Sequence, residues 1–202
     1  MWKKNKYKIV KNCISEELCN FAYDHLLLKK NVADILFQRK EIPGFSQEWG
    51  YYKDPQVVNT YSIYSDLVME QLLIKLKPKI EKIIGVKLIE NYSYARLYKK
   101  YDILKKHKDR YSCEFSATLN LGGDKWPIHL TSNNKNIKVN LNPGDMLIYK
   151  GCELEHWRDP FLGNICGQVF LHYNSNDDKN KWDNRPCLGY PYAVNIKTDV
   201  KK

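Results

Sequence analysis

The hydrophobic periodicity of the chain changes at Gly85, and this change constrains the fold more than any other feature. Before it, the segments 14–28 and 61–84 carry apolar residues three and four positions apart, which predicts two helices. The segment 30–60 is interrupted by prolines and glycines, so we expect it to be irregular and to lie at the mouth of any site. After Gly85, short segments rich in β-branched and aromatic residues predict seven or eight strands. Helices followed by strands predict an α+β fold, a β-sandwich or open barrel supported by N-terminal helices.

One predicted strand, the segment 113–121 with the sequence CEFSATLNL, is polar on one face and apolar on the other. Its polar face carries Glu114, Ser116, Thr118 and Asn120. Burying a hydroxyl group without a partner costs about 1–3 kcal/mol. We therefore expect these residues to face a polar cavity between two sheets.

The composition of the 202-residue chain excludes little. The formal net charge of +10 allows an acidic partner such as nucleic acid, but the lysines are spread along the whole chain. No apolar run approaches the roughly 20 residues of a membrane span, and the N-terminus lacks the apolar core of a signal peptide. We therefore expect a cytoplasmic protein with no membrane partner. The six cysteines form no CxxC framework, so a cysteine-based zinc site is not expected.

Three residues form a candidate metal site. His107 and Asp109 are two positions apart, so on a strand their side chains point the same way. His156 follows the turn 143–145, Pro-Gly-Asp, and begins a later strand. Two histidines and one carboxylate are the facial triad that holds non-haem Fe(II) and leaves coordination positions open. On these residues alone, an exposed His-x-Asp and an unrelated buried histidine remain an alternative.

The segment from about 92 to 174 resembles the Fe(II)- and 2-oxoglutarate-dependent oxygenases, particularly the prolyl 4-hydroxylase-like group. The matching features, in chain order, are the Tyr-x5-Leu-x2-His-x-Asp pattern of Tyr98, Leu104, His107 and Asp109, the strand SATLNLGG, the turn Pro143-Gly144-Asp145 and the distal His156. One departure is Tyr101, which stands where the family usually has glycine.

The resemblance implies one domain over 1–202 with a double-stranded β-helix core, of jelly-roll or cupin-like type. Helical support would span about 14–85, the β core about 86–174 and a polar C-terminal tail 175–202. The implied cofactors are Fe(II), 2-oxoglutarate and O2, with no catalytic residue beyond the metal ligands. The implied reaction converts 2-oxoglutarate and O2 to succinate and carbon dioxide while a substrate C–H bond is hydroxylated.

The residue that would bind the far carboxylate of 2-oxoglutarate departs from the family pattern. The arginine or lysine usual nine or ten residues after the distal histidine is replaced by Ile165 and Cys166. A buried carboxylate needs a partner, so we expect Arg158 to supply it, two positions beyond His156 on the same strand face. The neutral groups expected beside it are Tyr98, Thr118 and Gln168. The alternative is an ion pair between Arg158 and a neighbouring acid such as Asp159.

The substrate is less constrained. Family analogy favours a protein or peptide side chain, with proline as the first candidate, and a small molecule fits the same core. Oxidative demethylation of alkylated nucleic acid is possible but not favoured, because the last predicted strand lacks arginines. A non-catalytic cupin-like module, with a structural metal or none, is the third alternative, and a fourth protein ligand such as His172 or His129 would favour it. We expect both of these histidines to be structural instead. The oligomeric state is not predicted.

Overall fold

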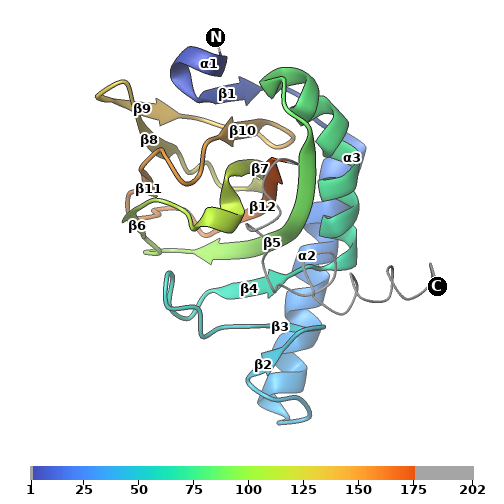
Figure 1. Cartoon of the computed structure of the whole chain (residues 1–202). Coiled ribbons are helices and arrows are strands. Elements are labelled where there is room, and N and C mark those ends of the chain that lie inside the picture. The colour runs from blue at the N-terminus through green and yellow to red at the C-terminus, as the bar shows by residue number, and fades with distance from the viewer. Residues whose placement is uncertain (1, 176–202) are drawn as a thin grey trace, which may run out of the picture.

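The computed structural model describes residues 2–175 (Figure 1), and the predicted polar tail therefore lies almost entirely outside the described residues. Its elements, in chain order, are α1 (Trp2–Asn5), β1 (Tyr7–Val10), α2 (Glu16–Gln38), β2 (Phe45–Ser46), β3 (Gly50–Tyr51), β4 (Tyr61–Tyr64), α3 (Leu67–Ile84), β5 (Leu88–Lys99), β6 (Leu104–His107), the 3-10 turn η1 (Tyr111–Cys113), β7 (Phe115–Gly123), β8 (Ile128–Ser132), β9 (Lys135–Val139), β10 (Met146–Tyr149), β11 (His156–Arg158) and β12 (Ile165–Ser175).

The strands form two antiparallel sheets. The large sheet has the order β1-β10-β7-β12-β5-β4-β3-β2, and the small sheet has the order β6-β11-β8-β9. From β5 onward the chain crosses between the sheets repeatedly, so that β5, β7, β10 and β12 lie in one sheet and β6, β8, β9 and β11 in the other. This winding is that of a jelly roll. It encloses an interior to which both sheets contribute side chains.

Helices α2 and α3 run along the large sheet, on the side away from the small sheet (Figure 1). The Ser15 hydroxyl accepts a hydrogen bond from the Leu18 amide at 3.3 Å and caps the start of α2. Asp66 caps α3 in the same way, through the amide of Val68 at 3.0 Å. Gly85 ends α3 with a φ of 75°, a conformation that glycine adopts without steric cost.

Both helices differ from the sequence prediction. Helix α2 continues ten residues beyond the expected end at 28, to Gln38. Phe21 and Leu28, two of the apolar residues whose spacing predicts this helix, are exposed. Helix α3 begins at Leu67, because the segment Tyr61–Tyr64 is strand β4 and pairs with β5. The four residues YSIY at 61–64 fit either periodicity, and only the pairing with β5 decides between them.

Within the described residues, no helix is both long enough and apolar enough to cross a membrane.

Candidate metal centre

Strand pairing brings the two predicted histidines together. His107 is the last residue of β6 and His156 is the first of β11, and these two residues are direct partners in the antiparallel register. Their ring centroids are 4.3 Å apart. Asp109 follows β6 by two residues, and its Oδ1 lies 3.6 Å from Nε2 of His107 and 3.4 Å from Nε2 of His156. The three side chains can therefore share one cation, as the sequence predicts.

Backbone carbonyls hold both imidazoles in the orientation that a metal site requires. Nδ1 of His107 donates to the carbonyl of Lys105 at 2.7 Å, and Nδ1 of His156 donates to the carbonyl of Leu154 at 3.0 Å. The Nε2 atom of each ring is then the nitrogen that lies near the carboxylate of Asp109. Such support fixes the tautomer and raises the basicity of the ligand.

The carboxylate of Asp109 is held by its surroundings on the other side. Its Oδ2 accepts a hydrogen bond from the hydroxyl of Ser116 at 2.7 Å, and its amide donates to the carbonyl of Gly151 at 2.9 Å. A β-carbon at Gly151 would lie 2.4 Å from Oδ2, so only glycine leaves room for this approach. Burial works to raise the pKa of Asp109, but hydrogen bonds and charge from the histidines hold it well below its usual value. Asp109 is therefore ionised, the form that binds a cation.

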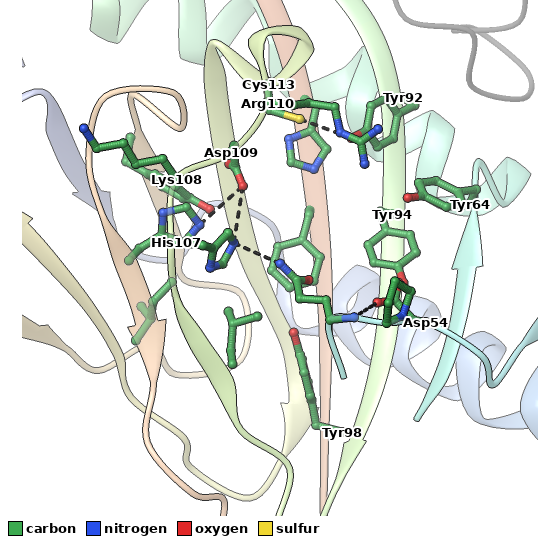
Figure 2. Close-up of a pocket in the computed structure, with 18 of the residues that line it drawn as sticks. Asp54, Tyr64, Tyr92, Tyr94, Tyr98, His107, Lys108, Asp109, Arg110 and Cys113 are labelled. Carbon is green, nitrogen blue, oxygen red and sulfur yellow. Dashed lines mark hydrogen bonds and ion pairs between the residues drawn. The ribbon is translucent and has the colours of Figure 1, made fainter. Parts of the chain in front are cut away.

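The three residues open into a cavity of about 410 Å³ between the sheets (Figure 2). Part of the lining is an aromatic wall whose rings contact one another: Tyr51, Tyr64, Tyr92, Tyr94 and Phe170. Lys108 and Arg110, which flank Asp109 in sequence, add positive charge to the lining. The segment between β3 and β4 contributes Asp54 and Gln56, which places part of the irregular segment 30–60 at the cavity, as expected.

Sequence reasoning missed a second buried arginine beside this cavity. Arg96 on β5 forms an ion pair with Asp54, at 2.9 Å from Nη2 to Oδ2, and donates to the hydroxyl of Tyr94 at 2.8 Å. Nη1 of Arg96 donates to Oε1 of Gln56 at 3.2 Å, and Nε2 of Gln56 donates to Nε2 of His107 at 2.9 Å. Gln56 therefore occupies the lone pair of His107 that a metal ion needs. The only sequence signal was the alternation of Arg96 with Tyr94 and Tyr98 along β5.

Removing the Gln56 amide is expected to strengthen metal binding. A cation at His107 must displace a hydrogen bond worth about 1 kcal/mol, so Gln56→Ala should lower the Kd for Ni²⁺ roughly fivefold, as measured by isothermal titration calorimetry. Gln71→Ala, on the exposed face of α3, is the matched control and should leave the Kd unchanged. Weaker binding in Gln56→Ala would contradict this expectation and would make the amide itself a ligand.

Arg158 lies in the interior, close to the neutral groups predicted to accompany it. Its Nη2 donates to Oε1 of Gln168 at 3.3 Å, and the same oxygen accepts from the hydroxyl of Thr118 at 3.3 Å. Nη1 donates to the carbonyl of Trp126, whose ring lies 5.0 Å from the guanidinium and 4.7 Å from the ring of Tyr98. The structure thus brings the four predicted residues to one region of the barrel interior, with Tyr98 also lining the cavity.

The charge of Arg158 is not balanced by any acid in the part of the chain that the structure describes. The alternative partner, Asp159, lies 3.2 Å from Nε2 of His129 instead. Nε of Arg158 is buried without a hydrogen-bond partner, and burial lowers the pKa of the guanidinium. A buried cation with an unused donor is suited to an anionic ligand.

The two remaining candidate histidines do not complete a four-ligand site with this triad. His129 pairs with Asp159 and does not line the cavity. His172 on β12 is buried, as expected of a core histidine, and its Nδ1 lies 3.1 Å from the hydroxyl of Ser116. His172 also lines the cavity, which the sequence did not settle.

The buried His172 should make stability depend on pH. Burial lowers its pKa from 6.5 to about 4, so the folded protein keeps this imidazole neutral while the unfolded chain protonates it. Its contribution is fully present above pH 6.5 and is lost as the pH falls toward 4. At about 1.4 kcal/mol per pKa unit, we expect the free energy of unfolding to fall by roughly 3 kcal/mol over this window. In urea titrations of metal-free protein, His172→Gln should reduce the decrease in the free energy of unfolding between pH 6.5 and pH 4, whereas His129→Gln should leave that decrease unchanged. If the free energy of unfolding depended on pH in His172→Gln as it does in the wild type, His172 would not be the group responsible.

Comparison with known proteins identifies the fold. No protein-family model and no curated protein sequence matches the chain. A prolyl-4-hydroxylase from Pseudomonas putida is similar in structure with a TM-score of 0.62 and 12% identity, over 87% of this chain and 95% of that one. HygX from Streptomyces hygroscopicus, solved with nickel and 2-oxoglutarate bound, has a TM-score of 0.64 and 10% identity, over 87% of this chain and 84% of that one.

A third similar structure is a prolyl hydroxylase from Trichoplax adhaerens in complex with a peptide fragment of hypoxia inducible factor. Its TM-score is 0.61 at 10% identity, over 87% of this chain and 86% of that one. These likenesses confirm the predicted α+β fold with a double-stranded β-helix core. They also confirm that the fold is the one found in 2-oxoglutarate oxygenases of the prolyl 4-hydroxylase type.

Proposed function

We propose that the chain is an Fe(II)- and 2-oxoglutarate-dependent oxygenase in which His107, Asp109 and His156 hold the iron. The observation that carries this proposal is the geometry of these three side chains. They supply two imidazole nitrogens and one carboxylate, and they leave the rest of the coordination sphere open to the cavity. A structural metal site would instead be closed by a fourth protein ligand. The likeness in fold to HygX, which was solved with nickel and 2-oxoglutarate bound, supports the same reading.

The residues around Arg158 fit the cosubstrate. We assign the far carboxylate of 2-oxoglutarate to the Arg158 guanidinium, which is buried, lacks a balancing acid and has an unpartnered Nε. Tyr98 lies beside it, while Thr118 and Gln168 supply hydroxyl and amide groups that hold the guanidinium in place. Arg96 is less suited, because Asp54 already balances its charge.

When bound, iron and 2-oxoglutarate supply the oxidising chemistry, in which 2-oxoglutarate and O2 yield succinate, carbon dioxide and a hydroxylated C–H bond. The protein holds the side chains of the site in position. His107 and His156 are kept in one tautomer by backbone carbonyls, and Ser116 holds one oxygen of Asp109 away from the histidine pair. The aromatic wall gives part of the cavity a surface against which an apolar group of a substrate can pack.

We further propose that the substrate is a protein or peptide side chain, with a proline-like ring as the first candidate. The aromatic wall offers ring faces against which an apolar ring can pack, among them Tyr64 and Tyr94, whose centroids are 4.4 Å apart. A small molecule would use the same cavity, and HygX was also solved with hygromycin B. Demethylation of nucleic acid is not favoured, because β12 carries no arginine.

The experiment that tests the activity needs no knowledge of the substrate. Metal-free protein is mixed anaerobically with Fe(II) and 2-oxoglutarate, O2 is admitted, and succinate is measured over time. We expect succinate to form through slow turnover without substrate, and to be absent when Ni²⁺ replaces Fe(II). Succinate no higher with Fe(II) than with Ni²⁺ would refute the proposal.

A further inference from the structure

A second group of possible metal ligands adjoins the first and shares one residue with it. Asp109, Cys113 and His172 each offer one ligand atom, and these atoms all lie within 4.8 Å of one another. They come from three different elements, the segment after β6, the turn η1 and the strand β12. All three line the 410 Å³ cavity, so an ion can reach them and water can complete its coordination.

The carboxylate of Asp109 stands between the two groups. Figure 2 shows His107 on one side of Asp109 and Cys113 on the other. Oδ1 faces the histidine pair, while Oδ2 accepts from Ser116, whose hydroxyl also contacts Nδ1 of His172 at 3.1 Å. The two oxygens of one carboxylate can bridge a pair of cations about 3.5–4 Å apart.

The donor set of the second group differs in kind from that of the first. A thiolate, an imidazole and a carboxylate are ligands that Zn²⁺ and Co²⁺ accept. The thiolate is a softer donor than any ligand of the first site, which has two imidazoles and a carboxylate. The sulfur of Cys113 lies 3.1 Å from the hydroxyl of Tyr92, which can donate a hydrogen bond to a metal-bound thiolate. The proposed oxygenase reaction uses neither Cys113 nor His172.

We propose that Asp109, Cys113 and His172 bind a second, thiophilic divalent cation of the Zn²⁺ class, which shares Asp109 with the first site. Cation binding at this position rests on geometry and donor chemistry alone, and it does not depend on the oxygenase activity. Because Asp109 serves both positions, a thiophilic cation here alters the site that would hold iron.

Cobalt titration tests this site directly. Metal-free full-length protein is titrated anaerobically with Co²⁺, and the thiolate-to-cobalt charge-transfer band is followed in the near ultraviolet. We expect the band in the wild type, its loss in Cys113→Ser and its reduction by at least half in His172→Gln. Cys152→Ser is the matched control, because Cys152 does not line the cavity, and this variant should keep the band. Near-ultraviolet circular dichroism checks that each variant is folded, and Cys113→Ala replaces Cys113→Ser if the latter is not.

The His107→Ala variant separates the two sites. We expect it to keep the charge-transfer band, since His107 belongs only to the first group. Absence of the band in the wild type, its survival in folded Cys113→Ser, or its loss in His107→Ala would each overturn the proposal. None of these readouts requires succinate formation, so failure of the second site and failure of the oxygenase proposal remain distinguishable.

Discussion

Asp109→Ala is expected to abolish succinate formation and to weaken Ni²⁺ binding by roughly 100-fold or more, beyond the 10–100-fold typical of residues that only support a ligand. Asp109 supplies the only carboxylate among the three side chains that face one another at the ends of β6 and β11. Without it, the cation would lose both a ligand and the one negative charge that attracts it into a buried site. Calorimetry gives the metal affinity, and the succinate assay gives the activity.

Asp159→Ala is the matched control for this prediction. Asp159 also pairs with a histidine, His129, but its side chain is 66% exposed and neither residue lines the cavity. Removing it should leave metal affinity and succinate formation within about twofold of the wild type, as expected for a surface pair. Equal loss in the two variants, or full metal affinity in Asp109→Ala, would contradict the assignment of the metal centre.

The three residues of the candidate metal centre could be predicted because their positions follow from strand periodicity. The two-residue spacing of His107 and Asp109 places both side chains on one side, and the turn at 143–145 leads through β10 toward β11, where His156 lies. Ser116 and Thr118 on the predicted polar face of β7 are both buried and hydrogen-bonded, to Asp109 and Gln168. The sequence predicts that the four residues of that face line the cavity, but none of them does. The contact between the histidines depends on the register of β6 with β11, which sequence spacing alone does not determine.

Other features depend on partners distant in sequence. Helix α2 extends past its expected end although lysines interrupt its apolar pattern. Lys29 pairs with Asp66, 37 positions away, at 2.6 Å, so this position is satisfied without an apolar contact. Gln56 has no periodicity to mark it. Its place at His107 follows from the buried pair of Asp54 and Arg96, which joins residues 42 positions apart.

The second large effect is expected at Arg158. Arg158→Met should raise the 2-oxoglutarate concentration needed for half-maximal succinate formation roughly 100-fold or more, because a buried carboxylate that loses its cation costs about 3–5 kcal/mol. Ni²⁺ affinity measured without 2-oxoglutarate should stay within about twofold of the wild type, since Arg158 is not among the three ligands. Arg158→Lys keeps the charge but not the forked geometry, so its 2-oxoglutarate requirement should fall between those of the wild type and Arg158→Met. An unchanged requirement in Arg158→Met would exclude this residue as the carboxylate partner.

Thermal unfolding distinguishes this role from a structural one, through comparison with Arg96. Without 2-oxoglutarate, Arg158→Met should be as stable as the wild type or more stable, because it removes a buried charge that no described acid balances. Arg96→Met should be destabilised by about 3–5 kcal/mol, because it leaves the buried Asp54 carboxylate without its partner. Adding 2-oxoglutarate with Ni²⁺ should raise the Tm of the wild type but not that of Arg158→Met, since only a bound ligand stabilises the folded state. If Arg158→Met kept this rise and Arg96→Met lost it, Arg96 would be the residue that binds 2-oxoglutarate.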